Sequence, residues 1–137
     1  RIVNLSYFYD AGLTDPDQLI ERYRTTTTLA AELAKPGHEI HVVHRFLNNA
    51  LVERQGVQFH FVKDRFPPGL KPWQIPLTLH NLVASLEPEL VHIHSLSFAA
   101  QAWCLRTRLN RACAIVMQDH AGQPMRRFGG VQRQLLK

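Results

Sequence analysis

The chain has 137 residues, of which 45% are hydrophobic and 20% charged, and its formal net charge at pH 7 is +5. This length fits one domain with its own packed core. No apolar run approaches the ~20 residues of a membrane-spanning helix, and no segment has the composition of a disordered chain.

The first third of the chain is expected to hold a strand and a helix. Ile2–Phe8 is a short apolar run of strand-forming residues, and a polar loop follows over Asp10–Asp17. Apolar residues recur at helical spacing through Gln18–Lys35, although the poor helix formers Thr25–Thr28 interrupt the pattern. Pro36 and Gly37 end this predicted helix, with glycine near the usual C-cap position.

Two strands and a second helix are predicted in the middle of the chain. Glu39–His44 and Val57–Val62 have the composition of strands. The alternation of apolar and polar residues in Val57–Val62 indicates an edge strand with one face in water. A proline-rich loop follows over Arg65–Pro72, and apolar residues at helical spacing predict an amphipathic helix over Ile75–Leu86.

The last third continues with strand, helix and strand. Leu90–His94 is the fourth predicted strand, Phe98–Leu109 a helix, and Ala114–Met117 the fifth strand. After a loop, Val131–Lys137 has the pattern of a helix whose end is not reached. Because the chain also begins with arginine rather than methionine, we expect it to be part of a longer protein.

This order predicts a single α/β domain with a doubly wound, Rossmann-like parallel sheet of about five strands. Right-handed crossovers, with the apolar first, fourth and fifth strands central, favour the strand order 3-2-1-4-5. The topological switch point then lies between the first and fourth strands, and ligands bind at the carboxyl ends of strands near such a point. The segments expected to meet there are Tyr9–Pro16, His94–Ser97 and Gln118–Pro124.

Several common nucleotide-binding and catalytic motifs are missing. Only Gly12 follows the first strand, so a Gly-x-Gly-x-x-Gly dinucleotide clamp has no support, and the chain has neither a P-loop nor a Gly-x-Ser-x-Gly elbow. A phosphorelay receiver has a similar topology, and Asp10 and Asp64 could supply its acidic residues. The lysine that such a receiver needs after the fifth strand is absent.

Eight histidines raise the question of a metal site. His38 and His44 would lie about 20 Å apart, because a strand rises ~3.3 Å per residue, and His41 would point to the opposite face of the strand. His92 and His94 share a face about 6.6 Å apart, but zinc would need a third ligand, for which only His120 is a candidate. We therefore expect no metal, and we interpret His92 as a hydrogen-bonded histidine inside the sheet.

His94 and His120 stand at the carboxyl ends of adjacent predicted strands, where ligands bind. A histidine in that place can donate a hydrogen bond to a hydroxyl or phosphate group, or act as a general base near neutral pH. We predict functional roles for both residues. The alternative is that each histidine anchors a loop.

Three runs resemble motifs of the GT-B glycosyltransferases, and more narrowly of the retaining family 4 type, which includes bacterial lipopolysaccharide and mannosyl transferases. Leu29–Val43 is similar to that group's helix-to-strand segment "LA..LA..GHEVHVV". Glu87–Ser95 resembles "PDVVHIHS", and Ile115–Gly122 resembles the strand end "VVxxHxG". The three runs occur in the expected order and spacing.

The resemblance implies that residues 1–137 form the N-terminal, acceptor-binding half of such an enzyme. A C-terminal half with an acidic E-x7-E motif would bind the nucleotide sugar. The complete enzyme would transfer a sugar from this donor to a hydroxyl of a glycan or lipid-linked acceptor, in polysaccharide or glycolipid biosynthesis, without a metal or other cofactor. The isolated chain would be inactive.

The resemblance also assigns roles to individual residues. His120 matches the histidine that lies beside the transferred sugar, so it is the predicted catalytic residue. The predicted substrate-binding residues are Tyr9, Asp10, Gly12, Arg24, His94, Ser95 and Asp119. One departure is that Ile20 and Glu21 occupy the positions of the family's glycine pair before the first helix. Gly12 or Arg24 would then contact anionic groups instead.

The charge and the cysteines predict where the enzyme works. Cys104 and Cys113 indicate reduced thiols and therefore a cytoplasmic location. The excess of basic over acidic residues favours anionic partners, here the inner face of a membrane rather than nucleic acid. A role of these charges in solubility alone explains the excess equally well. Two other functions stay open: a nucleotide-sugar epimerase of the same fold, and a non-catalytic α/β ligand-binding module.

Overall fold

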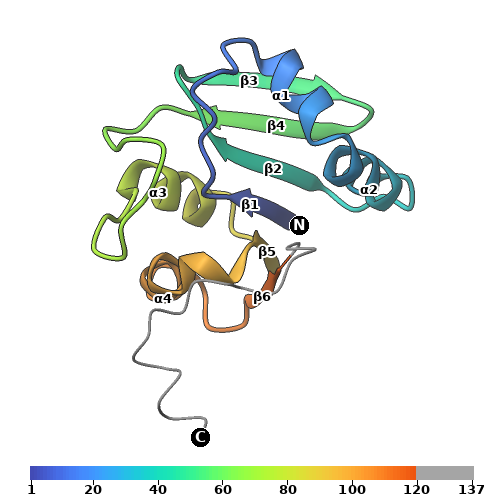
Figure 1. Ribbon diagram of the computed structural model, residues 1–137. Coiled ribbons are helices and arrows are strands. Elements are labelled where there is room, and N and C mark those ends of the chain that lie inside the picture. The colour runs from blue at the N-terminus through green and yellow to red at the C-terminus, as the bar shows by residue number, and fades with distance from the viewer. Residues whose placement is uncertain (120–137) are drawn as a thin grey trace, which may run out of the picture.

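One sheet of six strands forms the centre of the protein in the computed structural model, which describes residues 1–119 (Figure 1). The strands are β1 (Ile2–Ser6), β2 (Ile40–Arg45), β3 (Ala50–Arg54), β4 (Val57–Val62), β5 (Leu90–His94) and β6 (Ala114–Gln118). Their order is β3-β4-β2-β1-β5-β6, and every neighbouring pair is parallel except β3 and β4. Without β3 this is the predicted order 3-2-1-4-5, so the doubly wound α/β fold is confirmed.

One edge of the sheet differs from the predicted order. Val57–Val62, the predicted edge strand, is covered by β3, which pairs with it in an antiparallel hairpin. Gln55 and Gly56 connect the two strands, and both have a positive φ, +52° and +76°, as the tightest hairpin turns require. β6 forms the other edge of the sheet within residues 1–119, as the predicted order has it, although its apolar residues had suggested a central strand.

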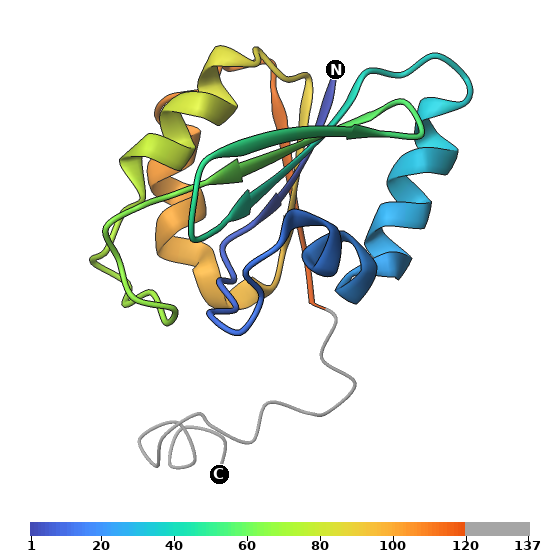
Figure 2. The same cartoon turned by 90° about the horizontal axis from the view of Figure 1, so that it is seen from above.

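Helices cover both faces of the sheet (Figure 2). One layer contains α1 (Pro16–Arg22) and α2 (Arg24–Ala34), and the other contains α3 (Leu77–Ser85), a short 3₁₀ turn (Leu96–Phe98) and α4 (Ala99–Arg106). Each layer buries its own apolar core against the sheet. None of the helices within residues 1–119 has the length and apolarity needed to cross a bilayer.

The single helix predicted over Gln18–Lys35 is in fact two helices. The break falls at Tyr23, whose φ and ψ of −102° and 37° are not helical, and the threonine run lies in the first turns of α2. The hydroxyl of Thr27 donates to the carbonyl oxygens of Ile20 and Tyr23 at 3.1 Å, and so links the end of α1 to the start of α2. The predicted stop is confirmed, because Gly37 follows α2 with a φ of +93°.

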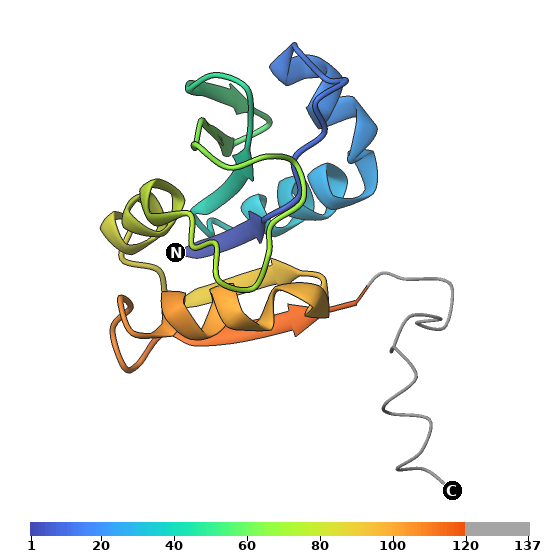
Figure 3. The same cartoon turned by 60° about the vertical axis from the view of Figure 1, so that its left-hand side comes forward.

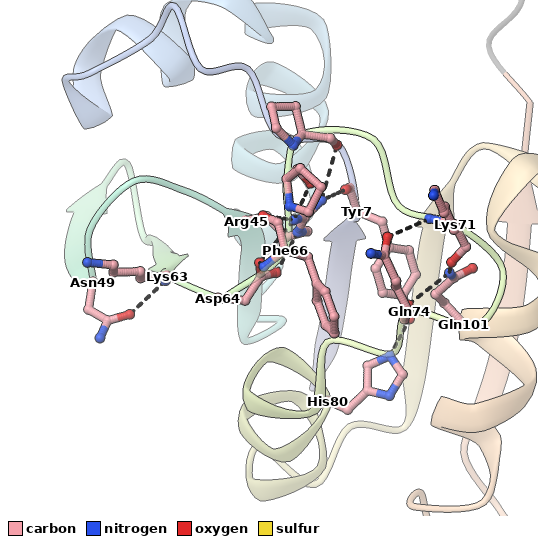
Figure 4. Close-up of polar contacts among 12 residues, drawn as sticks. Tyr7, Arg45, Asn49, Lys63, Asp64, Phe66, Lys71, Gln74, His80 and Gln101 are labelled. Carbon is pink, nitrogen blue, oxygen red and sulfur yellow. Dashed lines mark hydrogen bonds and ion pairs between the residues drawn. The ribbon is translucent and has the colours of Figure 1, made fainter.

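The long loop between β4 and α3 (Figure 3) is held by buried polar side chains (Figure 4). Arg45, 1% exposed, donates two hydrogen bonds to the carboxylate of Asp64, at 2.5 and 2.9 Å. The same guanidinium donates to the carbonyl oxygens of Tyr7, Phe66, Pro67 and Pro68. It therefore ties this loop to the end of β1.

Candidate functional site

A row of polar side chains crosses the sheet at the carboxyl ends of its parallel strands. Ser6, the last residue of β1, is in register with His44 of β2 on one side and with His94 of β5 on the other. His94 is in turn in register with Gln118 of β6. Because neighbours in register point to the same face of a sheet, all four side chains lie on the face that carries α1 and α2.

These residues form the floor of a cleft of about 560 Å³. Its remaining walls come from the loop after β1 and from the junction of α1 and α2. The lining residues are Ser6, Phe8, Arg22, Tyr23, Thr25, Thr26, Leu29, His44, His92, His94 and Gln118. The cleft thus lies at the predicted switch point between β1 and β5, and it combines hydroxyl, imidazole and amide groups with apolar surface.

The helix break at Tyr23 shapes one wall of the cleft. The Tyr23 ring lies 5.3 Å from the ring of His44, measured between centroids, with 30° between the planes. Partial burial, together with the nearby carboxylate of Asp10, raises the pKa of the Tyr23 phenol above its ordinary value. The phenol therefore stays protonated and keeps its ability to donate a hydrogen bond.

His44 is the most deeply buried of the histidines that line the cleft. Only 5% of the residue is exposed, and burial, reinforced by the neighbouring His94, lowers the pKa of its imidazole to about 3. Its Nδ1 atom is buried and has no hydrogen-bond partner within residues 1–119. His44 is therefore a neutral imidazole that both donates and accepts hydrogen bonds.

His92 and His94 lie side by side on the floor of the cleft. Their ring centroids are 4.6 Å apart with 51° between the planes, which agrees with the predicted shared face. Both residues are half-buried and line the cleft. His92 is therefore open to the cleft and is not enclosed within the sheet. In the part of the chain that the structure describes, no three histidine, cysteine or acidic side chains gather as a metal site would require.

Of the predicted site residues within residues 1–119, only His94 lines the cleft. Ser95 is buried, with a φ of +85°, and its hydroxyl accepts a hydrogen bond from the backbone N–H of Ser97 at 3.1 Å. Its own N–H donates to the carbonyl oxygen of Gln118 at 2.7 Å. Ser95 therefore joins the ends of β5 and β6 beside the cleft.

The predicted residues of the loop after β1 lie outside the cleft lining. The Tyr9 ring packs against the guanidinium of Arg45, 5.6 Å from its centroid. Asp10 is exposed, and its carboxylate accepts a hydrogen bond from the backbone N–H of Gly12 at 3.0 Å. These contacts order the loop, and the substrate-binding roles of its residues stay predictions.

The three remaining predicted site residues are Arg24, Asp119 and His120. Arg24 is exposed and forms an ion pair with Glu21, whereas the cation in the cleft lining is Arg22. Asp119 follows β6 and is exposed. His120, the predicted catalytic residue, lies outside the described residues, as does the helix predicted over Val131–Lys137.

Sequence reasoning missed most of the wall and part of the floor. Arg22, Tyr23, Thr25 and Thr26 reach the cleft because the helix breaks, and no motif marks that break. His44 was recoverable, since it ends a strand that neighbours the first strand in the predicted order. Aligning the ends of the parallel strands would have placed it beside Ser6.

Acid should destabilise the protein through His44, and a His44→Gln variant tests this. The folded-state pKa of about 3 lies below the ordinary 6.5, so the unfolded chain takes up the proton first as the pH falls. Stability is complete above pH 6.5 and declines toward pH 3, and by pH 5 the loss is up to about 2 kcal/mol. Urea unfolding at pH 7 and pH 5 should show a smaller acid loss in the variant.

The matched control is His38→Gln, which removes an exposed histidine and should leave the acid loss unchanged. The buried His80, whose pKa burial lowers to about 4, accounts for acid sensitivity that remains in the His44 variant. Equal acid losses in the His44→Gln variant and the wild type would contradict the neutral, buried state of His44.

Comparison with known proteins gives one match. The family model described as Glycosyltransferase Family 4 matches residues 24–137, which include α2, every strand after β1 and most of the cleft lining. No curated protein and no solved structure matches the chain.

Proposed function

Because the chain belongs to glycosyltransferase family 4, we propose that it is the N-terminal, acceptor-binding half of a GT-B enzyme. The enzyme would transfer a sugar from a nucleotide-sugar donor to a hydroxyl of a glycan or lipid-linked acceptor. The observation that carries this proposal is the polar row Ser6–His44–His94–Gln118 at the switch point, inside a cleft of about 560 Å³. The nucleotide sugar would be bound chiefly by a second half beyond Lys137.

The chemistry of the cleft suits a sugar. Sugars present many hydroxyl groups that both donate and accept hydrogen bonds, and neutral imidazole, hydroxyl and amide groups match them. His44, His94 and Gln118 supply these groups along the floor. Phe8 and Leu29 contribute apolar surface, against which the C–H faces of a sugar ring can pack.

This half would act in catalysis by positioning its substrate. Holding the acceptor hydroxyl in line with the donor converts a bimolecular step into an effectively unimolecular one. Arg22 provides a cation at the wall of the cleft, suited to an anionic group such as a phosphate of the donor. His120, two residues after the cleft residue Gln118, is proposed to contact the transferred sugar at the reaction centre.

The proposed setting is the cytoplasm, with peripheral contact at the inner face of an anionic membrane. The free thiols of Cys104 and Cys113 and the net charge of +5 support it, since cytosolic proteins keep thiols reduced and a basic protein is attracted to anionic surfaces.

The test compares the 137-residue chain with the longer protein that continues past Lys137, using a panel of nucleotide sugars and acceptors. We expect the longer protein to transfer sugar and the 137-residue chain to show no turnover, because one wall of the site would be missing. Robust transfer by the 137-residue chain alone would contradict the half-site account. Epimerisation of the donor without transfer would favour an epimerase, and a coding sequence ending at Lys137 would favour a binding module.

A further inference from the structure

A tight turn on the loop between β4 and α3 presents a tryptophan to solvent. The backbone N–H of Gln74 donates to the carbonyl oxygen of Lys71 at 2.9 Å, and the N–H of Lys71 donates to the side-chain oxygen of Gln74 at 2.9 Å. Trp73 lies at the tip of this turn and is 74% exposed. An indole is among the largest apolar groups in a protein, so its exposure on an ordered turn needs a reason.

The position of Trp73 is set by a buried side chain of a neighbouring helix. Gln101 of α4 is only 1% exposed, and its amide donates to the carbonyl oxygens of Lys71 and Gln74 at 3.0 and 3.1 Å (Figure 4). These two carbonyls flank Pro72 and Trp73. A satisfied buried amide selects one conformation of the backbone it binds, so the turn holds the indole outward.

The loop that carries Trp73 and the start of α3 offer basic and apolar side chains. The ammonium group of Lys71 lies 5.4 Å from the Trp73 ring centroid. Arg65, at the start of the same loop, and Leu77, the first residue of α3, line one cavity, and Leu77 is 47% exposed. No acidic residue occurs from Arg65 to Leu86, and Asp64 just before this segment is already paired with Arg45.

We propose that this surface, defined by Arg65, Lys71, Trp73 and Leu77, docks the protein on an anionic lipid surface. Indole groups favour the interface between water and lipid because one end is polar and the body is apolar. Cations next to them add attraction to acidic headgroups. This proposal rests on the proposed function, which includes a peripheral membrane contact. It assigns that contact to the loop between β4 and α3 and the start of α3.

A glycan is the main competing partner, since sugar rings also pack on exposed tryptophan. The charge of the surface favours lipid, because packing against a neutral sugar requires no cation, whereas an acidic lipid headgroup does. The two cations and the absence of acidic residues over Arg65–Leu86 are therefore explained by lipid and not by a neutral glycan.

The two tryptophans of the chain, Trp73 and Trp103, make a direct test possible. Trp103 is 76% exposed on α4. It lies two residues after Gln101, which is about 200° around the helix, so it is on the side of α4 opposite to the side chain that binds the Trp73 turn. A Trp103→Phe variant reports only on Trp73, and a Trp73→Phe variant reports only on Trp103. Both are mixed with phosphatidylcholine vesicles, with and without phosphatidylglycerol, and the lipids include brominated chains that quench indole emission.

We expect vesicles with phosphatidylglycerol to shift the emission of the Trp103→Phe variant to the blue and to quench it, while neutral vesicles leave it unchanged. The emission of Trp103 in the Trp73→Phe variant should stay unshifted. Lys71→Gln and Arg65→Gln should each weaken vesicle binding about fivefold. Arg111→Gln, which removes one exposed charge near the start of β6, is the matched control and should bind like the wild type.

Four results would overturn the proposal: no binding to phosphatidylglycerol vesicles, equal binding to neutral vesicles, quenching of Trp103 rather than Trp73, or an equal loss from Arg111→Gln. A blue shift of Trp73 caused by a soluble oligosaccharide such as maltoheptaose, without vesicle binding, would identify a glycan surface instead. These measurements need no sugar transfer, so their outcome is separate from that of the transferase assay.

Discussion

An Arg45→Met substitution is expected to lower the free energy of unfolding by about 3–5 kcal/mol, the usual cost of removing one partner from a buried ion pair. The side chains of Arg45 and Asp64 are 1% and 6% exposed. The carboxylate of Asp64 would therefore remain buried without its counter-charge. The difference is measured by urea unfolding of the variant and the wild type.

The hydrogen bonds of Arg45 explain why the expected loss is large. Besides Asp64, its guanidinium satisfies carbonyl oxygens at the end of β1 and along residues 66–68. Methionine fills a similar volume but donates no hydrogen bond, so these acceptors also lose their partner. The substitution thus removes a charge and the contacts that fix the loop between β4 and α3.

The matched control is Arg54→Met. Arg54 also pairs with an aspartate, Asp17, but the two side chains are 53% and 64% exposed, and exposed pairs contribute about 0–1 kcal/mol. Arg45→Met combined with Asp64→Asn should cost less than the sum of the single substitutions, because the buried charge is then absent. A loss below about 1 kcal/mol for Arg45→Met would contradict the importance assigned to this pair.

Replacing His120 with alanine in the complete enzyme is expected to lower kcat by about 10²–10³-fold while the protein stays folded. That range is typical for removing one group that stabilises the reaction centre. The expectation rests on the sequence run around His120 and on the floor of the cleft, where Gln118 lies two residues before it. Sugar transfer is measured at saturating donor, and circular dichroism checks the fold.

His38→Ala is the matched control for this experiment. His38 is exposed and precedes the amino end of β2. The cleft lies at the opposite, carboxyl ends of the strands. This control should retain the wild-type rate. An unchanged rate in His120→Ala would assign His120 a structural role and would remove the catalytic residue from the proposed mechanism.

The strands and their order were largely predictable because the signals are local. β4 and β5 were predicted with the bounds observed, since alternation or apolar runs bounded by turn residues are unambiguous there. The order of the five parallel strands then followed from the handedness of crossovers. β3 was missed because it is mostly exposed and therefore lacks a clear apolar pattern, although the Gln55-Gly56 pair before Val57 was a usable hairpin signal.

The position of the cleft was predictable from the sequence, but most of the residues that line it were not. Parallel strands bring their carboxyl ends to one end of the sheet, so the switch point predicted the position of the cleft and His94 as one of its lining residues; the substrate-binding role of His94 stays a prediction. The predicted loop residues Tyr9, Asp10 and Gly12 lie beside the cleft lining instead. Their side chains and backbone make contacts within the loop or with Arg45.

The sequence by itself thus determined the fold class, the family motifs and the edge of the sheet where a ligand would bind, because each depends on neighbouring residues or on general rules of chain connection. Only the tertiary structure decided that Ser6, His44 and His94 stand in one row, that the helix breaks at Tyr23, and that Gln101 holds Trp73 outward. These features depend on register, burial and contacts between residues far apart in the chain. No local pattern encodes them, because the partners meet only when the sheet and its two helical layers have packed.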